Sequence, residues 1–298
     1  MKKIILAAAT LAFLLSGCNS DSKNAGKLFQ RAELAFAAGD YNLARLQIDS
    51  IRTYYPKAVD VRKAGIHLMQ QIDLQEQHKT LAYLDSMMTV KQAELDSIKG
   101  NFVLEKDTAY QEIGNYFYPS QVVEKNIGRS FLRAQVNELG EMSLTSIYCA
   151  GGNIHHTAVK VSANDDTFAE TPASTDSYET TDLGRAIEKA DYKVGNDGGV
   201  AAYIAANKDK KSLKLEFIGD RNYKTTMYAN DIKAITEVSN LARILAGMEE
   251  IRKEQKEANL KIQFVTRKIE EGEANLIYVD ATDRFLSKLE NVTDPEQK

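Results

Sequence analysis

Apolar residues recur every seven positions in two long stretches of the chain. In residues 59–102 the repeating positions are Leu74, Leu81, Met88, Leu95 and Phe102, with Leu84 and Ile98 at the complementary spacing. In residues 231–298 they are Leu241, Met248, Ile262, Ile269 and Leu276, with Ile244, Ile251, Ala258, Val265 and Val279 as the second set. This spacing places each set on one side of a helix, which is typical of a coiled-coil seam.

Each apolar stripe needs a partner, because an isolated helix would leave it in water. The simplest partner is the other helix, antiparallel and in the same chain, and the alternative is a parallel homodimer between two chains. Polar residues at Lys91 and Gln255 interrupt the seams and could set the register in either case. A last short helix is expected near 281–292.

Between the two seams, residues 103–230 change to a period of two. Leu132, Ala134 and Val136 alternate with polar residues, and residues 155–161 place Thr157, Val159 and Val161 on one face. We expect a small antiparallel, sandwich-like β domain. Consecutive strands are predicted at 199–207, 212–220 and 223–231, a short helix capped by Asp182 at 182–191, and an exposed excursion at 164–182.

Residues 25–58 carry spaced small residues and turn signals. Ala32 and Ala44 would allow two helices to approach closely, Gly39 permits a turn between them, and Pro56 ends the second helix. Together with Asp40, Tyr41 and Ile48 these residues resemble a tetratricopeptide repeat. The resemblance implies a helical hairpin at 27–58. One repeat cannot form a peptide-binding groove, so we expect the hairpin to pack against other helices.

The N-terminus has the order of an export signal. Lys2 and Lys3 precede an apolar run, residues 4–15, that is too short to span a membrane. The ending Leu15-Ser16-Gly17-Cys18 resembles the lipobox of bacterial lipoproteins. The resemblance implies that the signal peptide, residues 1–17, is removed, that Cys18 carries diacylglycerol and palmitate, and that residues 18–26 are a lipidated leash. The alternative is an ordinary secretory signal.

The expected location is the cell envelope, in the outer membrane facing the periplasm. Lipoproteins of Bacteroidetes-like bacteria often carry an acidic tag for surface display, but here only Asp21 is acidic, so surface exposure stays open. The net charge of −4 argues against a nucleic-acid partner. Cys149 follows an apolar run, so we expect it to be buried.

The sequence offers little that points to catalysis. His155 and His156 are adjacent on an expected strand and would point to opposite faces, so no shared metal is predicted. The glycine-rich residues 193–200 lack the Lys-Ser/Thr of a phosphate loop and are interpreted as a turn. We therefore expect a non-enzyme without catalytic residues, metal or cofactor.

Tyrosines support an alternative function. Residues 115–120 contain the densest aromatic cluster, and Tyr116 and Tyr118 could stack on a sugar ring, although the chain has no tryptophan. Packing of these tyrosines in the core or at its rim is the favoured interpretation, because tyrosine packs well in strands. A glycan-binding surface lipoprotein is thus the alternative. An efflux-adaptor-like periplasmic protein is less favoured, because its β domains would flank the helical hairpin and here the β region lies between helices.

These observations predict an α+β protein. A helical base, residues 27–58, would lead to a rising coiled-coil helix at 59–102, a β head at 103–230 and a descending helix at 231–298. The predicted function is that of a membrane-anchored envelope lipoprotein with a structural or adaptor role. It would bind another envelope protein through its head or its stalk.

Overall fold

The computed structural model of the protein describes residues 20–182, 184–210 and 212–290, excepting the side chains of 274–290. The chain divides into two compact units, one of residues 1–82 with 256–298 and one of residues 83–255. Cys18 lies outside the described residues. Among those residues, no helix combines the length and the hydrophobicity that a membrane crossing requires.

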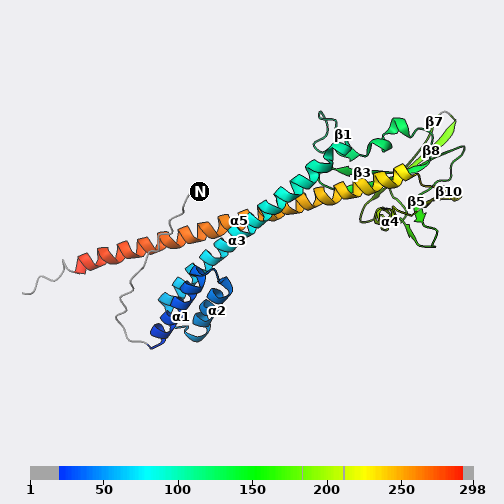
Figure 1. Ribbon diagram of the computed structural model, residues 1–298. Helices are drawn as coiled ribbons and strands as arrows, with labels where there is room; N and C mark the ends of the chain where they lie inside the picture. The colour runs from blue at the N-terminus through cyan, green and yellow to red at the C-terminus, as the bar shows by residue number, and fades with distance from the viewer. Residues whose placement is uncertain (1–19, 183, 211, 291–298) are drawn as a thin grey trace, which may run out of the picture. The chain divides into compact units, whose positions relative to one another are not determined.

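The first unit contains the predicted helical hairpin. Helices α1 (Ser20–Ala37) and α2 (Tyr41–Tyr54) lie side by side (Figure 1). The turn between them uses Gly39 at φ +77°, and the Asp40 carboxylate caps α2 by accepting the Leu43 N–H at 3.0 Å. Ala32 and Ala44 are fully buried, as the close approach of two helices requires.

The leash predicted at 18–26 is wrong for residues 20–26, because α1 already begins at Ser20. The physical reason is packing. Ala25 is buried in a small cluster with Ile51 and Ala58, so the extra turns of helix cover apolar surface of α2 and the residues that follow it.

The same unit contains the first half of α3 (Val59–Ile98) and part of α5 (Ala229–Glu290). Leu68 and Ile72 of α3 join the core of the hairpin, and Arg45 of α2 pairs with Asp73 and Glu76 at 2.6 Å each. The separate last helix expected near 281–292 is wrong, because α5 continues to Glu290 as one helix of 62 residues. No proline interrupts that stretch.

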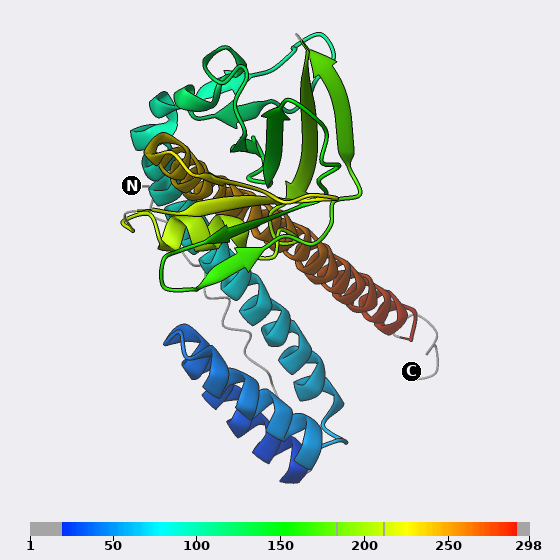
Figure 2. The ribbon, with the colours of Figure 1, turned by 90° about the vertical axis from the view of Figure 1, so that its right-hand side faces the viewer.

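The second unit contains two antiparallel sheets (Figure 2). The larger sheet has the strand order β1 (Val103–Glu105), β2 (Asn115–Phe117), β3 (Phe131–Asn137), β4 (Met142–Ala150), β8 (Arg185–Lys193), β7 (Ser177–Asp182). The smaller has the order β10 (Tyr223–Thr226), β9 (Lys214–Ile218), β5 (Ala158–Ser162), β6 (Phe168–Glu170). Short 3₁₀ turns lie at Lys99–Asn101, Pro119–Gln121 and Val123–Lys125.

Several strand predictions are confirmed. Leu132, Ala134 and Val136 are buried on the inner face of β3, Val159 and Val161 are buried on β5, and β9 and β10 form a hairpin. Thr157 lies outside β5 and is exposed. The excursion at 164–182 is mainly exposed, and it supplies the edge strands β6 and β7.

Two element predictions in this region are wrong. Residues 182–191, expected as a helix, lie mostly in β8, which pairs with β4 along eight residues. Residues 199–207, expected as a strand, contain the helix α4 (Val200–Ala206). Its alanines favour a helix, and the Asp197 carboxylate accepts the Ala201 N–H at 2.8 Å near its start.

The two sheets share one core with α5. Ile235, Val238 and Leu241 of α5 are fully buried in the cluster that holds Leu144 of the larger sheet and Phe217 of the smaller one. The predicted boundary of the β head at 230 is therefore too early. The first turns of α5 are part of the domain's interior, so the architecture is α+β, with two antiparallel sheets and a helix that share one core.

Within this unit, α3 and α5 run in opposite directions. Gln255 Nε2 donates to Asp85 Oδ1 at 2.7 Å, and the Lys91 side chain lies against Gly247. The seam residues Leu84, Leu95, Met248 and Ile251 are buried. The two apolar stripes thus face the interior here, and the helices pair inside one chain.

This pairing is tested by a disulfide. With Cys18 and Cys149 replaced by alanine, D85C together with Q255C should oxidise to a cross-link within one chain, because the two side chains are in contact. T89C with Q255C, about one helical turn out of register, is the control and should cross-link poorly. Non-reducing electrophoresis separates the outcomes, and a covalent dimer as the main product of D85C/Q255C would contradict pairing within the chain.

Candidate functional site

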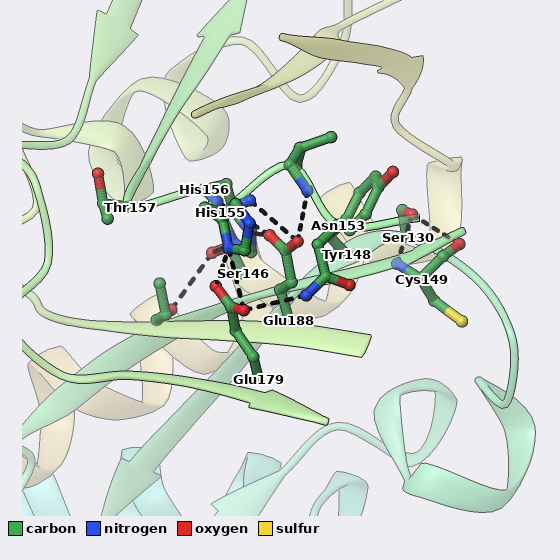
Figure 3. Close-up of polar contacts among 12 residues, drawn as sticks. Ser130, Ser146, Tyr148, Cys149, Asn153, His155, His156, Thr157, Glu179 and Glu188 are labelled. Atoms are coloured by element: carbon green, nitrogen blue, oxygen red, sulfur yellow. Dashed lines mark hydrogen bonds and ion pairs between the residues drawn. The ribbon is translucent and has the colours of Figure 1, made fainter. Parts of the chain in front are cut away.

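A buried carboxylate organises the centre of the second unit. Glu188 of β8 points into the interior and is 1% exposed. One of its oxygens accepts the N–H groups of Ile154 at 2.6 Å and His155 at 3.0 Å. The other accepts the His156 N–H at 2.9 Å and lies 2.8 Å from His156 Nδ1 (Figure 3). All four acceptor positions of the carboxylate are therefore used.

These contacts set the charges of the pair. Burial alone would raise the pKa of Glu188, but the hydrogen bonds from His156, Ile154 and His155 outweigh it and lower that pKa. Burial lowers the pKa of His156, against the opposing effect of Glu188. At neutral pH the carboxylate is thus ionised and the imidazole is neutral, so Nδ1 carries the proton that is donated to Glu188.

The tautomer leaves His156 Nε2 as an acceptor for the Ser146 hydroxyl, 2.7 Å away. Tyr192, whose hydroxyl donates to the Thr157 carbonyl at 3.0 Å, lies 3.3 Å from the same serine oxygen. A Ser-His-Glu chain of this kind is the arrangement that activates a serine nucleophile. Here Ser146 is fully buried, and so is the His156 ring.

We assign the Ser146–His156–Glu188 hydrogen-bond chain a structural role, because in this conformation no substrate can reach the Ser146 oxygen. Ser146 lies on β4 and Glu188 on β8, both in the larger sheet, whereas residues 154–157 lead into β5 of the smaller sheet. The hydrogen bonds therefore fasten one sheet to the entry of the other. They also satisfy polar groups that would be costly to bury unpaired.

Beside the Ser146–His156–Glu188 hydrogen-bond chain, His155 and Glu179 form an exposed pair. His155 has a left-handed backbone at φ +54°, and its Nδ1 lies 2.9 and 3.0 Å from the two Glu179 oxygens. Asn153 Nδ2 donates to the same carboxylate at 3.0 Å. The hydrogen bond and the charge of Glu179 raise the pKa of His155. The two histidines thus have opposite pKa shifts although they are neighbours in sequence.

The cluster of His155, Glu179 and Glu188 has the composition of a metal site, with one ligand atom of each within 4.8 Å of the others. The sequence did not indicate this cluster, because Glu179 and Glu188 follow His155 by 24 and 33 residues and lie on the strands β7 and β8. However, Glu188 already accepts four hydrogen bonds and has no lone pair left for an ion. Two exposed ligands remain, so the geometry does not define a metal centre.

The predicted sugar-stacking residues lie elsewhere. Tyr116 on β2 is only 4% exposed and belongs to the core. Tyr118 is partly buried, packs edge-on against Phe102, and has Lys233 Nζ 5.8 Å from its ring centre. Tyr116 offers no ring face to a sugar, so its predicted binding role is not supported. The physical reason is that the inward side of β2 needs a large apolar residue.

A pocket of about 200 Å³ opens where β3, β4 and β10 approach the start of α5. Cys149, which is buried as expected, lies in its wall together with Phe131 and Met227. Ser130 holds the backbone of Cys149, accepting its N–H at 2.9 Å. Two arginines, Arg129 and Arg185, also line the pocket. No local sequence pattern predicts this pocket, because its lining residues are spread over the range from Gly128 to Asp231.

Comparisons with known proteins leave the chain without an assigned family. No protein-family description matches it, and no solved structure does. A glutamine-hydrolyzing GMP synthase of Natranaerobius thermophilus is 69% identical over 29 residues, which are 10% of this chain and 6% of that enzyme. The chain thus spans a small fraction of that relative, and a match of this length indicates neither fold nor activity.

The structural role of Glu188 predicts a loss of stability on substitution. E188Q replaces one accepting oxygen by an NH₂ group that faces donors, so the free energy of unfolding should fall by about 1–3 kcal/mol. Urea unfolding followed by circular dichroism measures this change. E179Q removes the same charge from the exposed neighbour and should cost much less. Equal losses in the two variants would contradict the role given to Glu188.

Proposed function

We propose that the protein is a lipid-anchored lipoprotein of the bacterial cell envelope with a structural or adaptor role. The observation that carries the proposal is the order of the N-terminus: two lysines, a short apolar run, and Leu15-Ser16-Gly17 before Cys18. An acylated Cys18 would supply a membrane affinity that a short apolar run cannot. The outer membrane, facing the periplasm, is the proposed location.

The long helices would form a coiled-coil stalk within this proposal. Their seam positions are buried or half-buried from Leu241 to Ile269 in α5. In the second unit, Asp85 contacts Gln255 and Lys91 lies against Gly247, so residue numbers rise along α3 as they fall along α5. In the first unit, His67 of α3 lies 3.8 Å from Glu273 of α5. Both support antiparallel pairing of α3 with α5 inside one chain rather than a homodimer.

We place the binding of an envelope protein on residues 103–127 of the β domain. This segment exposes large apolar side chains, including Tyr110 at 90% and Ile127 at 74%. Val123 and Leu104 are also exposed. Association with a protein partner would remove these apolar side chains from water. The burial of Tyr116 in the same segment favours protein binding over stacking on a sugar.

The anchor is tested by C18A, with C149A as the matched control. C18A should move the protein from the membrane fraction to the soluble fraction and abolish the incorporation of labelled palmitate, because the acylated sulfur is removed. C149A alters a buried thiol and should leave both measurements unchanged. Membrane association of C18A equal to that of the unaltered chain would contradict the lipid anchor.

The adaptor role is tested by photo-cross-linking in intact cells. A photoreactive phenylalanine in place of Tyr110 should yield a covalent adduct with a protein of the envelope, identified by mass spectrometry. The same substitution at Tyr83, an exposed tyrosine of α3, is the control and should yield much less of that adduct. The absence of an adduct from position 110, with normal protein levels, would contradict a partner at this segment.

A further inference from the structure

The pocket at the start of α5 is lined by an arginine, Arg185, that forms no ion pair with the described residues, although Asp182 is its register partner on β7. Its charged lining residues are Arg129, Arg185 and Asp231. Arg129 forms a two-pronged pair with the Asp231 carboxylate, with both N–O distances at 2.7 Å. Among the described residues, no carboxylate forms an ion pair with Arg185. The pocket therefore has a net charge of one positive unit, and that charge lies on Arg185.

The hydrogen-bond donors in the pocket lead to the same residue. Arg129 donates Nε–H and one Nη2–H to Asn126 and two further N–H groups to Asp231, so one of its five donors remains. The guanidinium N–H groups of Arg185 form no hydrogen bond to the described residues. Arg185 is exposed and lines the pocket. A planar fork of N–H groups matches the oxygens of a carboxylate or a phosphate.

The backbone makes room for this guanidinium. Gly128 has φ +76° and lies so close that a Cβ at its position would be 3.0 Å from Arg185 Nη1. The pocket of about 200 Å³ is smaller than the roughly 300–1,000 Å³ typical of drug-sized ligands. The surface that it offers is mainly polar and includes Thr225 and the rim tyrosine Tyr228. A compact, hydroxylated ligand fits these features better than an apolar one.

We propose that this pocket binds the carboxylate or phosphate group of a small polar molecule, and that Arg185 holds the oxyanion. The ring of Tyr228, 5.2 Å from the guanidinium of Arg129, would form one wall for the rest of the molecule. Arg129 acts as a positioning residue, because its pair with Asp231 ties the entry of β3 to α5. This inference goes beyond the proposed adaptor role and does not depend on the lipid anchor.

Calorimetric titration of the full chain at low ionic strength tests the proposal with three probes: galacturonate, galactose and inorganic phosphate. Galactose is the neutral match of galacturonate and should not bind. Binding of galacturonate alone identifies a carboxylate ligand, and binding of phosphate alone identifies a phosphate ester. R185Q should lower the affinity for the bound anion by about tenfold or more, because a charge-assisted hydrogen bond is lost.

Two further variants separate binding from folding. R221Q removes an exposed arginine outside the pocket and should leave the affinity unchanged within about twofold, which is less than 0.5 kcal/mol by the same conversion. R185K keeps the charge without the fork and should have an intermediate affinity. The proposal is overturned if neither anion binds, if galactose binds as well as galacturonate, or if R221Q weakens binding as much as R185Q.

Discussion

The carboxylate of Glu188 is the group on which the two-sheet domain depends. An ionised group in the interior is costly unless every one of its acceptor positions is filled. Here the donors come from Ile154, His155 and His156, the residues through which the chain passes from the larger sheet to the smaller one. One charge therefore fastens the larger sheet to the entry of the smaller one, beside the apolar core that both sheets share. His155, whose N–H donates to one of the Glu188 oxygens, has a left-handed backbone at φ +54°.

The second constraint is that the two compact units of the protein share the helix α5. Its first turns supply Ile235, Val238 and Leu241 to the core between the sheets, and its later turns belong to the helical unit. The β domain is thus not a module that could be removed from between two helices. Any deletion that ends at residue 230 would expose these apolar side chains to water, at a cost of roughly 1.5–3 kcal/mol for each large one.

The pocket is a consequence of the same arrangement. Arg129 precedes β3 and Asp231 lies in the first turn of α5, and their ion pair joins the larger sheet to the helix. Because Asp231 neutralises Arg129, Arg185 from β8 is the cation that remains for a ligand. The proposed adaptor segment, residues 103–127, ends directly before Gly128, which lines the proposed oxyanion site, and its Asn126 accepts hydrogen bonds from Arg129 of that site.

The sequence by itself determined the elements whose side-chain periodicity is regular. The heptads of α3 and α5, the hairpin of α1 and α2, and the alternation in β3 all follow from residues close in the chain. Only the tertiary structure decided that residues 185–193 form strand β8, because the inward-facing Glu188 disguises their period of two. Only the tertiary structure decided where the pocket forms, because its residues lie far apart in sequence. The sequence singled out His155 and His156 but not Glu179 and Glu188. Local pattern records which side of an element is buried, whereas the partners of a buried charge are fixed by contacts between distant segments.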